Sequence, residues 1–203
     1  MSTPIYIIGI NASPRKNSNT EILMHRIMES AKSQNAVTEL VHLKDLNIKP
    51  CLACEGCRVA QVCRVHADDM QVLISKLKAA QGIVLGSPVH NYNISSFMKI
   101  FLDRMYPLHY FNPENRLEHY SLLEQNKKTV IYTIGEQKSC KYSDMALNAM
   151  RLPMKTLGCD IIQEFAASGF FKTGSVLKDE KLLQTAYKAG VDLVQSLKDN
   201  NDE

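Results

Sequence analysis

The sequence has little net charge and no long apolar run. Lys and Arg outnumber Asp and Glu by only 24 to 21, and these charges are scattered along the chain. A nucleic-acid footprint or a polybasic membrane patch needs a larger and more clustered positive excess. No stretch approaches the roughly 20 apolar residues that cross a bilayer, and no basic region or cleavage site precedes the apolar residues 5–8. We therefore expect a cytoplasmic protein with no nucleic-acid or membrane partner.

Several common chemical signatures are also missing. The loop at residues 11–19 contains neither G-x-G-x-x-G nor G-K-S/T, which argues against a dinucleotide pyrophosphate site and a P-loop. A response-regulator receiver domain needs acidic residues where Asn11 and Ala12 stand. The six histidines do not have the spacing of zinc ligands, and we find no Ser/His/Asp set and no paired carboxylates. We therefore assign no catalytic residue.

What the chain does have is an alternation of short β-rich runs and amphipathic helical patterns. We predict strands at about 5–10, 38–43, 82–86, 129–134 and 160–166, and helices that start after residue 18 and cover about 68–80, 95–106, 142 onward and 179–197. Five strand–helix units in this order predict an α/β fold, with a parallel sheet covered by helices on both faces.

The domain organisation follows from the same pattern. We take residues 1–198 as one domain with a cysteine-rich insert at about 50–64, and we expect residues 199–203 to fray. The segment at 107–126 is polar and irregular, and the sequence leaves open whether it is a lid, a dimer contact or a loose loop.

Ligands of parallel sheets bind beyond the carboxyl ends of the strands, which selects the loops at 11–19, 87–93 and 135–139. The first loop precedes a helix, and the unpaired amides at a helix N-terminus suit a phosphate. Hydroxyl or guanidinium donors are available from Ser13, Arg15, Ser18 and Thr20. The pattern favours a monophosphate site. The alternative is that Ser18 and Asn19 only cap the helix.

A cysteine cluster is the second chemical signal. Four cysteines have the spacing C-x2-C-x2-C-x5-C: Cys51, Cys54, Cys57 and Cys63. Such compact runs present thiolates to iron–sulfur clusters, whereas zinc sites more often use two separated C-x2-C knuckles. The sequence leaves three alternatives open, namely an iron–sulfur cluster, free thiols and zinc.

Other residues near the cysteines have simpler interpretations. Positive charge from Arg58 and Arg64 beside bound thiolates would stabilise a reduced cluster or lower a thiol pKa, but the commoner explanation is two solvated loop residues. Asp68 and Asp69 are interpreted as residues that open a helix at its positive end. The isolated Cys140 and Cys159 are interpreted as plain small residues.

Four segments carry a family resemblance. They are residues 9–20 (Gly-Ile-Asn-Ala-Ser-Pro-Arg-Lys-Asn-Ser-Asn-Thr), 86–89 (Gly-Ser-Pro-Val), 101–104 (Phe-Leu-Asp-Arg) and 159–169. Together they resemble the NADPH-dependent FMN reductase family, a flavodoxin-like group. The resemblance implies a doubly wound five-stranded sheet in the order 2-1-3-4-5. The chain departs from the family at Ala12 and Ser18, where glycine is common, and at His90, where an aromatic residue is common.

The resemblance also implies which residues bind FMN. Residues around the phosphate would be Ser13, Arg15, Ser18, Asn19 and Thr20. Residues around the isoalloxazine ring would be Pro88, Val89, His90, Asn91, Tyr92, Asn93, Thr133, Gly135 and Glu136. His90 has a surface-loop interpretation as well, and Tyr92 is interpreted as a packing or ring-stacking residue.

The cysteine motif at this place resembles the iron–sulfur flavoprotein branch of the family. This implies that Cys51, Cys54, Cys57 and Cys63 hold a 4Fe-4S cluster that exchanges electrons with FMN, in a homodimer or higher homo-oligomer. The implied function is an FMN-dependent oxidoreductase whose electron donor is NAD(P)H or a ferredoxin. The alternatives are a cluster-free NAD(P)H-dependent FMN or quinone reductase and a non-enzymatic binding module on the same fold.

Overall fold

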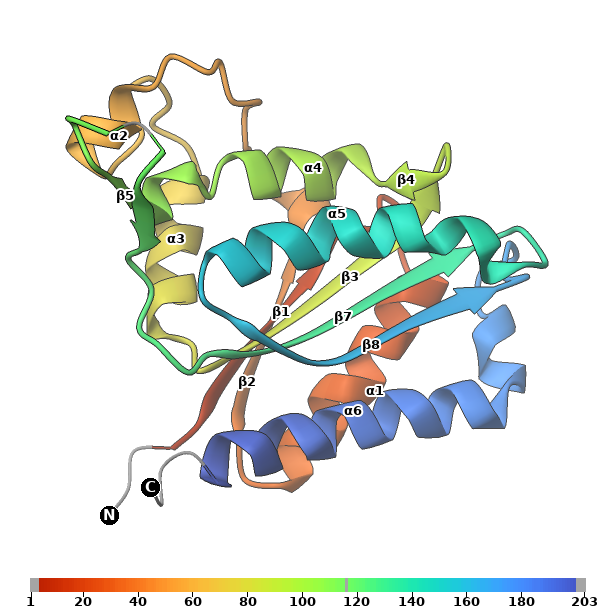
Figure 1. Ribbon diagram of the computed structural model, residues 1–203. Coiled ribbons are helices and arrows are strands. Elements are labelled where there is room, and N and C mark those ends of the chain that lie inside the picture. Colours follow the sequence, from red (N-terminus) through yellow and green to blue (C-terminus); the bar gives the residue numbers. More distant parts are fainter. Residues whose placement is uncertain (1–3, 116, 200–203) are drawn as a thin grey trace.

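The structure is a computed structural model that describes residues 4–115 and 117–199. A parallel sheet of five strands lies at its centre, in the order β2-β1-β3-β7-β8 (Figure 1). The strands of this sheet are β1 (Tyr6–Asn11), β2 (Val37–His42), β3 (Gly82–His90), β7 (Lys128–Gly135) and β8 (Asp160–Ser168). The predicted order 2-1-3-4-5 is therefore confirmed.

Helices cover both faces of this sheet, as Figure 1 shows. The covering helices are α1 (Asn19–Ser33), α3 (Met70–Ala79), α4 (Ser96–Asp103), α5 (Ser143–Thr156) and α6 (Glu180–Asp199). The short helix α2 (Gly56–Ala60) has no buried residue and lies apart from the sheet, at the upper left of Figure 1. Short 3-10 turns lie at Leu43–Asp45, Tyr106–Leu108, Cys140–Tyr142 and Ser175–Lys178. None of the helices in the described ranges is long and apolar enough to cross a membrane.

Two apolar layers hold the helices to the sheet. Side chains of α1 and α6, such as Leu23 and Leu193, pack on one face. Side chains of α3, α4 and α5, such as Leu73, Phe101 and Met150, pack on the other. All five of these side chains are buried. Burial of this kind is the main stabilising contribution to a fold of this size.

The third predicted strand is longer than expected, because the chain turns back on it. β3 continues to His90, and β4 (Asn93–Ile94) pairs antiparallel with its end. Asn91 and Tyr92 make the two-residue turn, both with positive φ, 46° and 66°. Such a turn matches the twist of a hairpin. The loop predicted at 87–93 is therefore a hairpin tip that projects from the carboxyl end of β3.

The segment predicted to be irregular is also ordered. It contains a hairpin of β5 (His109–Phe111) and β6 (His119–Ser121), which form a separate two-stranded sheet. The stacked rings of Tyr110 and Tyr120, 4.6 Å apart, lie across this pair. The expectation of an irregular segment was therefore wrong. Of the tail predicted to fray, Asp199 lies in α6 and residues 200–203 are outside the described ranges.

Candidate functional site

Two neighbouring hollows lie at the carboxyl edge of the sheet. The first, which we call the α1 hollow, has a volume of about 150 Å³. It is lined by Ser13, Pro14, Arg15, Ser18, Asn19, Thr20, Pro88, Val89, His90, Ile134, Glu136, Phe170, Phe171 and Thr173. The second, the β7 hollow, measures about 190 Å³ and is lined by Val89, Asn91, Tyr92, Gly135, Glu136, Gln137, Ser139, Ser143 and Ser168. Because both contain Val89 and Glu136, they are adjacent.

The loop before α1 is shaped by its own polar side chains. The Asn11 side-chain oxygen accepts a hydrogen bond from the Ser13 amide at 3.1 Å, and Ser13 Oγ accepts one from the Arg15 amide at 3.2 Å. Ser18 Oγ then caps α1 by accepting from the Glu21 amide at 3.1 Å. The predicted capping role of Ser18 is confirmed. The amide end of α1 therefore faces a hollow with the electrostatic character of an anion site.

Arg15 and Asn19 connect this loop to the chain that follows β8. Arg15 Nη1 donates to the Phe171 carbonyl at 3.2 Å, and its guanidinium lies 5.1 Å from the Phe171 ring centroid. Asn19 Nδ2 donates to the Lys172 carbonyl at 3.0 Å and to Ser175 Oγ at 3.3 Å. The Asn19 side chain therefore anchors the neighbouring loop, which leaves its backbone amide as the group available to a ligand.

His90 lines the α1 hollow together with Arg15. Burial lowers the pKa of His90, and the positive charge of Arg15 lowers it further. The imidazole is therefore neutral near pH 7, with one ring nitrogen able to donate a hydrogen bond and the other able to accept.

The structure brings together nearly all of the residues predicted to bind FMN. All except Asn93 and Thr133 line one of the two hollows. The Asn93 side chain accepts a hydrogen bond from the Ile94 amide within β4 at 2.8 Å. Thr133 is fully buried in β7. No contact with either hollow supports these two. The assignment of FMN to the residues that do line the hollows is likewise still a prediction.

Sequence reasoning missed the loop after β8. Phe170, Phe171 and Thr173 line the α1 hollow, and the Phe170 amide donates to the Gly135 carbonyl at 3.0 Å. The signal was available, because this loop also follows the carboxyl end of a parallel strand. The same rule that selected the other three loops selects this one.

Gly86 of β3 leaves space for a side chain of the neighbouring strand β7. An added Cβ at Gly86 would overlap the ring of Tyr132. The Tyr132 side chain is fully buried, and its hydroxyl donates to the Thr20 carbonyl at 2.6 Å. Gly86 thus leaves room for a ring that holds the first turn of α1 against the sheet.

A third and larger cavity lies elsewhere, around the cysteine segment. We call it the cysteine cavity; its volume is about 910 Å³. All four clustered cysteines line it, Cys51, Cys54, Cys57 and Cys63, together with Arg58, Arg64 and Arg104. Cys51 and Cys54 are exposed, whereas Cys57 and Cys63 are partly buried.

The backbone around the cysteines is curled. Ala53, Glu55 and Gln61 have φ angles of 50°, 58° and 54°, in the left-handed region that non-glycine residues rarely adopt. Each such residue costs on the order of 1–3 kcal/mol, and strained residues of this kind concentrate at ligand sites. Here the curl turns successive cysteines toward one cavity.

The hairpin of β5 and β6 forms the facing wall. Arg58 of α2 lies 4.0 Å above the Phe111 ring and donates to the Tyr106 hydroxyl at 3.1 Å. The rings of Tyr106 and Phe111 are stacked at 4.7 Å. Arg58 is therefore packed on an aromatic surface, and the interpretation of it as a solvated loop residue was wrong. The segment at 107–126 shapes the cysteine cavity.

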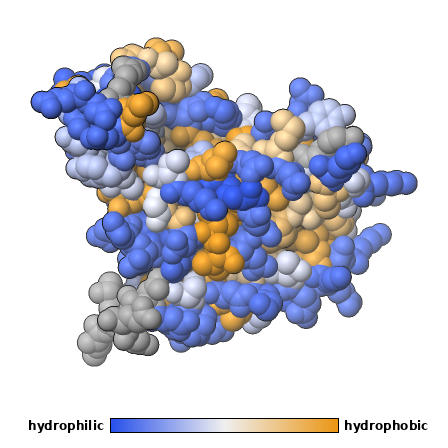
Figure 2. All heavy atoms as spheres, in the orientation of Figure 1, coloured by the Kyte–Doolittle hydropathy of each residue, from blue (hydrophilic) through white to orange (hydrophobic). Residues whose placement is uncertain are grey.

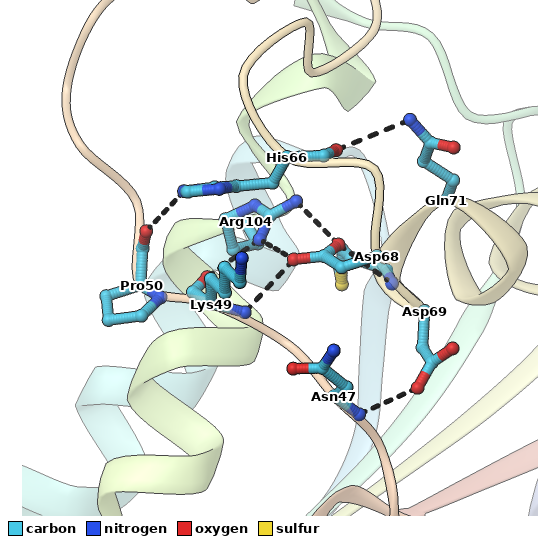
Figure 3. Close-up of polar contacts among 9 residues, drawn as sticks. Asn47, Lys49, Pro50, His66, Asp68, Asp69, Gln71 and Arg104 are labelled. Carbon is cyan, nitrogen blue, oxygen red and sulfur yellow. Dashed lines mark hydrogen bonds and ion pairs between the residues drawn. The ribbon is translucent and has the colours of Figure 1, made fainter.

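A buried ion pair between Arg104 and Asp68 joins the two ends of the cysteine segment, residues 50–67 (Figure 3). Arg104 donates to Asp68 at 2.7 and 2.9 Å and to the Lys49 carbonyl at 2.7 Å. Their side chains are only 2% and 1% exposed. The interpretation of Asp68 as a helix-opening charge was incomplete, since its carboxylate joins both ends of the segment to the end of α4.

The four thiols can be compared with the ligand sets of known metal groups. In the described part of the chain, no three His, Cys, Asp or Glu side chains gather closely enough for a single metal ion. A cubane cluster instead attaches each thiolate to a different iron, so its ligands surround a larger space. Burial raises the pKa of Cys57, and negative charge on Cys51, Cys63 and Cys54 raises it further. The four thiols therefore border one cavity, and four cysteine sulfurs are a ligand set that iron–sulfur clusters and structural zinc sites both use.

Residues 5–147 match the family described as NADPH-dependent FMN reductase. The chain belongs to this family. The predicted resemblance to this family is confirmed.

Individual relatives of the NADPH-dependent FMN reductase family extend this finding. An iron-sulfur flavoprotein of Methanocaldococcus jannaschii is 35% identical over 102 residues, which is 50% of this chain and 52% of the relative, so this match spans about half of either protein. An iron-sulfur flavoprotein of Archaeoglobus fulgidus is 28% identical over 189 residues, 89% of each chain.

Solved structures show the fold. A flavone reductase has a TM-score of 0.74 at 17% identity, covering 97% of this chain but only 64% of that one. A flavodoxin from the domain Archaea has a TM-score of 0.59 at 14% identity and covers 96% of this chain and 99% of that one. The predicted flavodoxin-like fold is thus confirmed.

Proposed function

We propose that this chain is an FMN-dependent oxidoreductase in which Cys51, Cys54, Cys57 and Cys63 hold a 4Fe-4S cluster that exchanges electrons with FMN. FMN takes up electrons singly or as a hydride, and an iron–sulfur cluster takes them one at a time. The single observation that supports the cluster most is that all four thiols line one cavity together with three arginines. The names of the archaeal relatives point the same way.

The two hollows at the sheet edge support the FMN site. In this proposal the phosphate binds in the α1 hollow, against the amides of α1 and the Arg15 guanidinium. The isoalloxazine ring lies toward the β7 hollow, beside the hairpin tip at Asn91 and Tyr92. Backbone amides of that hairpin and of the loop after Gly135 would bind the polar edge of the ring, which tunes its redox chemistry.

Exposed apolar side chains around the cysteine cavity support a partner subunit. The hairpin of β3 and β4, which borders the proposed FMN site, comes directly before α4. The cysteine cavity is lined by residues at the other end of α4, a helix of eight residues that is about 12 Å long. The rim of the cysteine cavity carries exposed apolar side chains, with Leu52 64%, Leu117 87% and Leu152 61% exposed. At the upper left of Figure 2, where Figure 1 places α2, a few hydrophobic side chains lie among mostly hydrophilic ones. We propose a homodimer or higher homo-oligomer that covers this rim.

Anaerobic purification with metal and flavin analysis tests the proposal. We expect about four iron atoms, four acid-labile sulfides and one FMN per chain. The matched variant Cys57→Ser should lose iron and sulfide but keep FMN, because Cys57 lines only the cysteine cavity.

The family description favours one second candidate, a cluster-free reductase that uses NAD(P)H. FMN without iron or sulfide, in protein never exposed to air, would support this candidate and contradict the cluster. A chain that binds neither FMN nor iron would contradict both and leave a non-enzymatic binding module. Stopped-flow mixing with NADPH or with reduced ferredoxin, followed at the flavin absorbance, identifies the electron donor.

A further inference from the structure

The ends of the cysteine segment are joined by more than the ion pair. The Lys49 amide donates to Asp68 Oδ2 at 3.0 Å, and the Lys49 carbonyl accepts from Arg104 at 2.7 Å. The Asp68 carboxylate and the Arg104 guanidinium thus bind the backbone amide and carbonyl of Lys49, the residue just before the segment. Figure 3 shows a second connection, between the His66 ring and the Pro50 carbonyl at 3.0 Å.

Fold stability alone does not explain why the two ends of the segment are joined by a charged pair, Arg104 and Asp68. Removing two ions from water costs several kcal/mol each, and apolar replacements of a buried pair are often neutral or stabilising. A hydrogen-bonded closure without charge would join the same two ends. The charge itself is therefore the feature that needs a function.

The pair is oriented relative to the cavity. Arg104 lines the cysteine cavity together with Cys51 and Cys63, whereas Asp68 is not among the residues that line it. Burial lowers the pKa of Arg104, but the hydrogen bonds and charge of Asp68 and the negative charge of Cys63 and Cys51 together hold it above its ordinary value. The positive end of the pair thus faces the thiols.

We propose that Arg104, held by Asp68, is a positioning residue that fixes the spacing of Cys51 and Cys63 and places a positive charge beside the cluster. This inference rests on the proposed function. Reduction adds one negative charge to the cluster, and a fixed positive charge at its edge favours the reduced form. Arg104 therefore raises the midpoint potential, and Asp68 partly offsets this effect.

Two substitutions change the charge in opposite directions. Arg104→Gln removes a positive charge and should make the midpoint potential more negative. Asp68→Asn removes a negative charge and should make it more positive. A purely structural role would loosen the segment in both variants and would not give shifts of opposite sign.

The measurement is an anaerobic dithionite titration through mediator dyes, followed by electron paramagnetic resonance and normalised to iron and sulfide. Each cluster accepts one electron from the mediator, and no bond forms or breaks. Lys188→Gln is the matched control, because Lys188 pairs with Asp192 on the exposed side of α6. The midpoint potential of the cluster in Lys188→Gln should equal that of the wild type.

Opposite shifts support the proposal, and unchanged potentials or shifts in one direction overturn it. Should Arg104→Gln fail to fold, Asp68→Asn decides alone: a positive shift supports the role and a wild-type potential overturns it. Limited proteolysis of cofactor-free Arg104→Lys gives a further readout, since lysine keeps the charge but cannot make both bonds to Asp68. Faster cleavage within residues 50–67 than in the wild type is expected, and equal cleavage would contradict the positioning role. A wild type that never takes up a cluster would instead contradict the proposed function.

Discussion

Arg15 is the residue whose charge most directly serves the proposed phosphate site. It extends from the loop before α1 to the carbonyl and ring of Phe171, so its guanidinium spans the edge of the α1 hollow. Hydrogen bonds to charged groups contribute about 1.5–3 kcal/mol. A bound phosphate would therefore gain much of its affinity from this one side chain.

Arg15→Ala is expected to weaken FMN binding about 10–100-fold, which corresponds to that energy at 1.4 kcal/mol per factor of ten. Quenching of flavin fluorescence on titration measures the dissociation constant. Lys16→Ala is the control, because Lys16 is exposed and does not line the hollow. Equal affinity of Arg15→Ala and the control would contradict the phosphate assignment.

Asp68 gives a second prediction at this scale, in the form of a pH dependence. Burial raises the pKa of Asp68, but hydrogen bonds from Arg104 and the Lys49 amide outweigh it and hold the pKa below the ordinary value. A lowered carboxyl pKa stabilises the fold at pH values above the unfolded pKa of about 4, and this contribution disappears as the pH falls through the folded pKa.

Asp68→Asn should therefore lower the free energy of unfolding by about 3–5 kcal/mol at pH 7, the cost of leaving one member of a buried pair alone. Below pH 4 the difference from the wild type should shrink progressively, since the wild-type contribution is lost as the pH falls from the unfolded pKa through the lowered folded pKa. Urea unfolding at both pH values measures this, with Asp192→Asn as an exposed control. A difference that is the same at both pH values would contradict the account.

At the scale of elements, the regular part of the fold was predictable and the irregular part was not. The five strands and the helices of the two apolar layers have clear periodicity in the sequence. The hairpin of β5 and β6 has strands of only three residues, too short for an alternating pattern to stand out. The same limit hid α2, which has five residues.

The candidate site divides in the same way. Loops beyond the carboxyl ends of strands could be selected from topology, and the cysteines from their spacing. The partner of Asp68 could not, because Arg104 lies 36 positions further along the chain and only the folded arrangement brings them together.

The contact between α1 and α6 gives the prediction for this scale. Gly190 lies where α6 passes closest to α1, and an added Cβ would clash with Ser30 Oγ and the Ile27 carbonyl. Gly190→Ala should therefore force the helices apart and lower the free energy of unfolding by about 1–3 kcal/mol, in spite of the better helix propensity of alanine. Chemical denaturation measures the loss. Unchanged or increased stability would show that the two helices are free to separate.

For the whole molecule, the account depends on two separate sites in each chain and on a partner that covers the cysteine cavity. Leu152→Glu places a charge on the exposed rim of that cavity and should shift the sedimentation profile from dimer toward monomer. Val72→Glu, on α3 and equally exposed, should not change it. A monomeric wild type would contradict the proposed assembly and leave the two cofactor sites as they are.

The most direct test of the central claim is the electron paramagnetic resonance spectrum of anaerobically prepared, dithionite-reduced protein that contains FMN. The account predicts the signal of one reduced 4Fe-4S cluster per chain in the wild type and in Cys140→Ser, a cysteine outside the cavity. The signal should be lost or altered in Cys63→Ser. A flavin-loaded wild type with no cluster signal, or a signal indifferent to Cys63, would contradict the account.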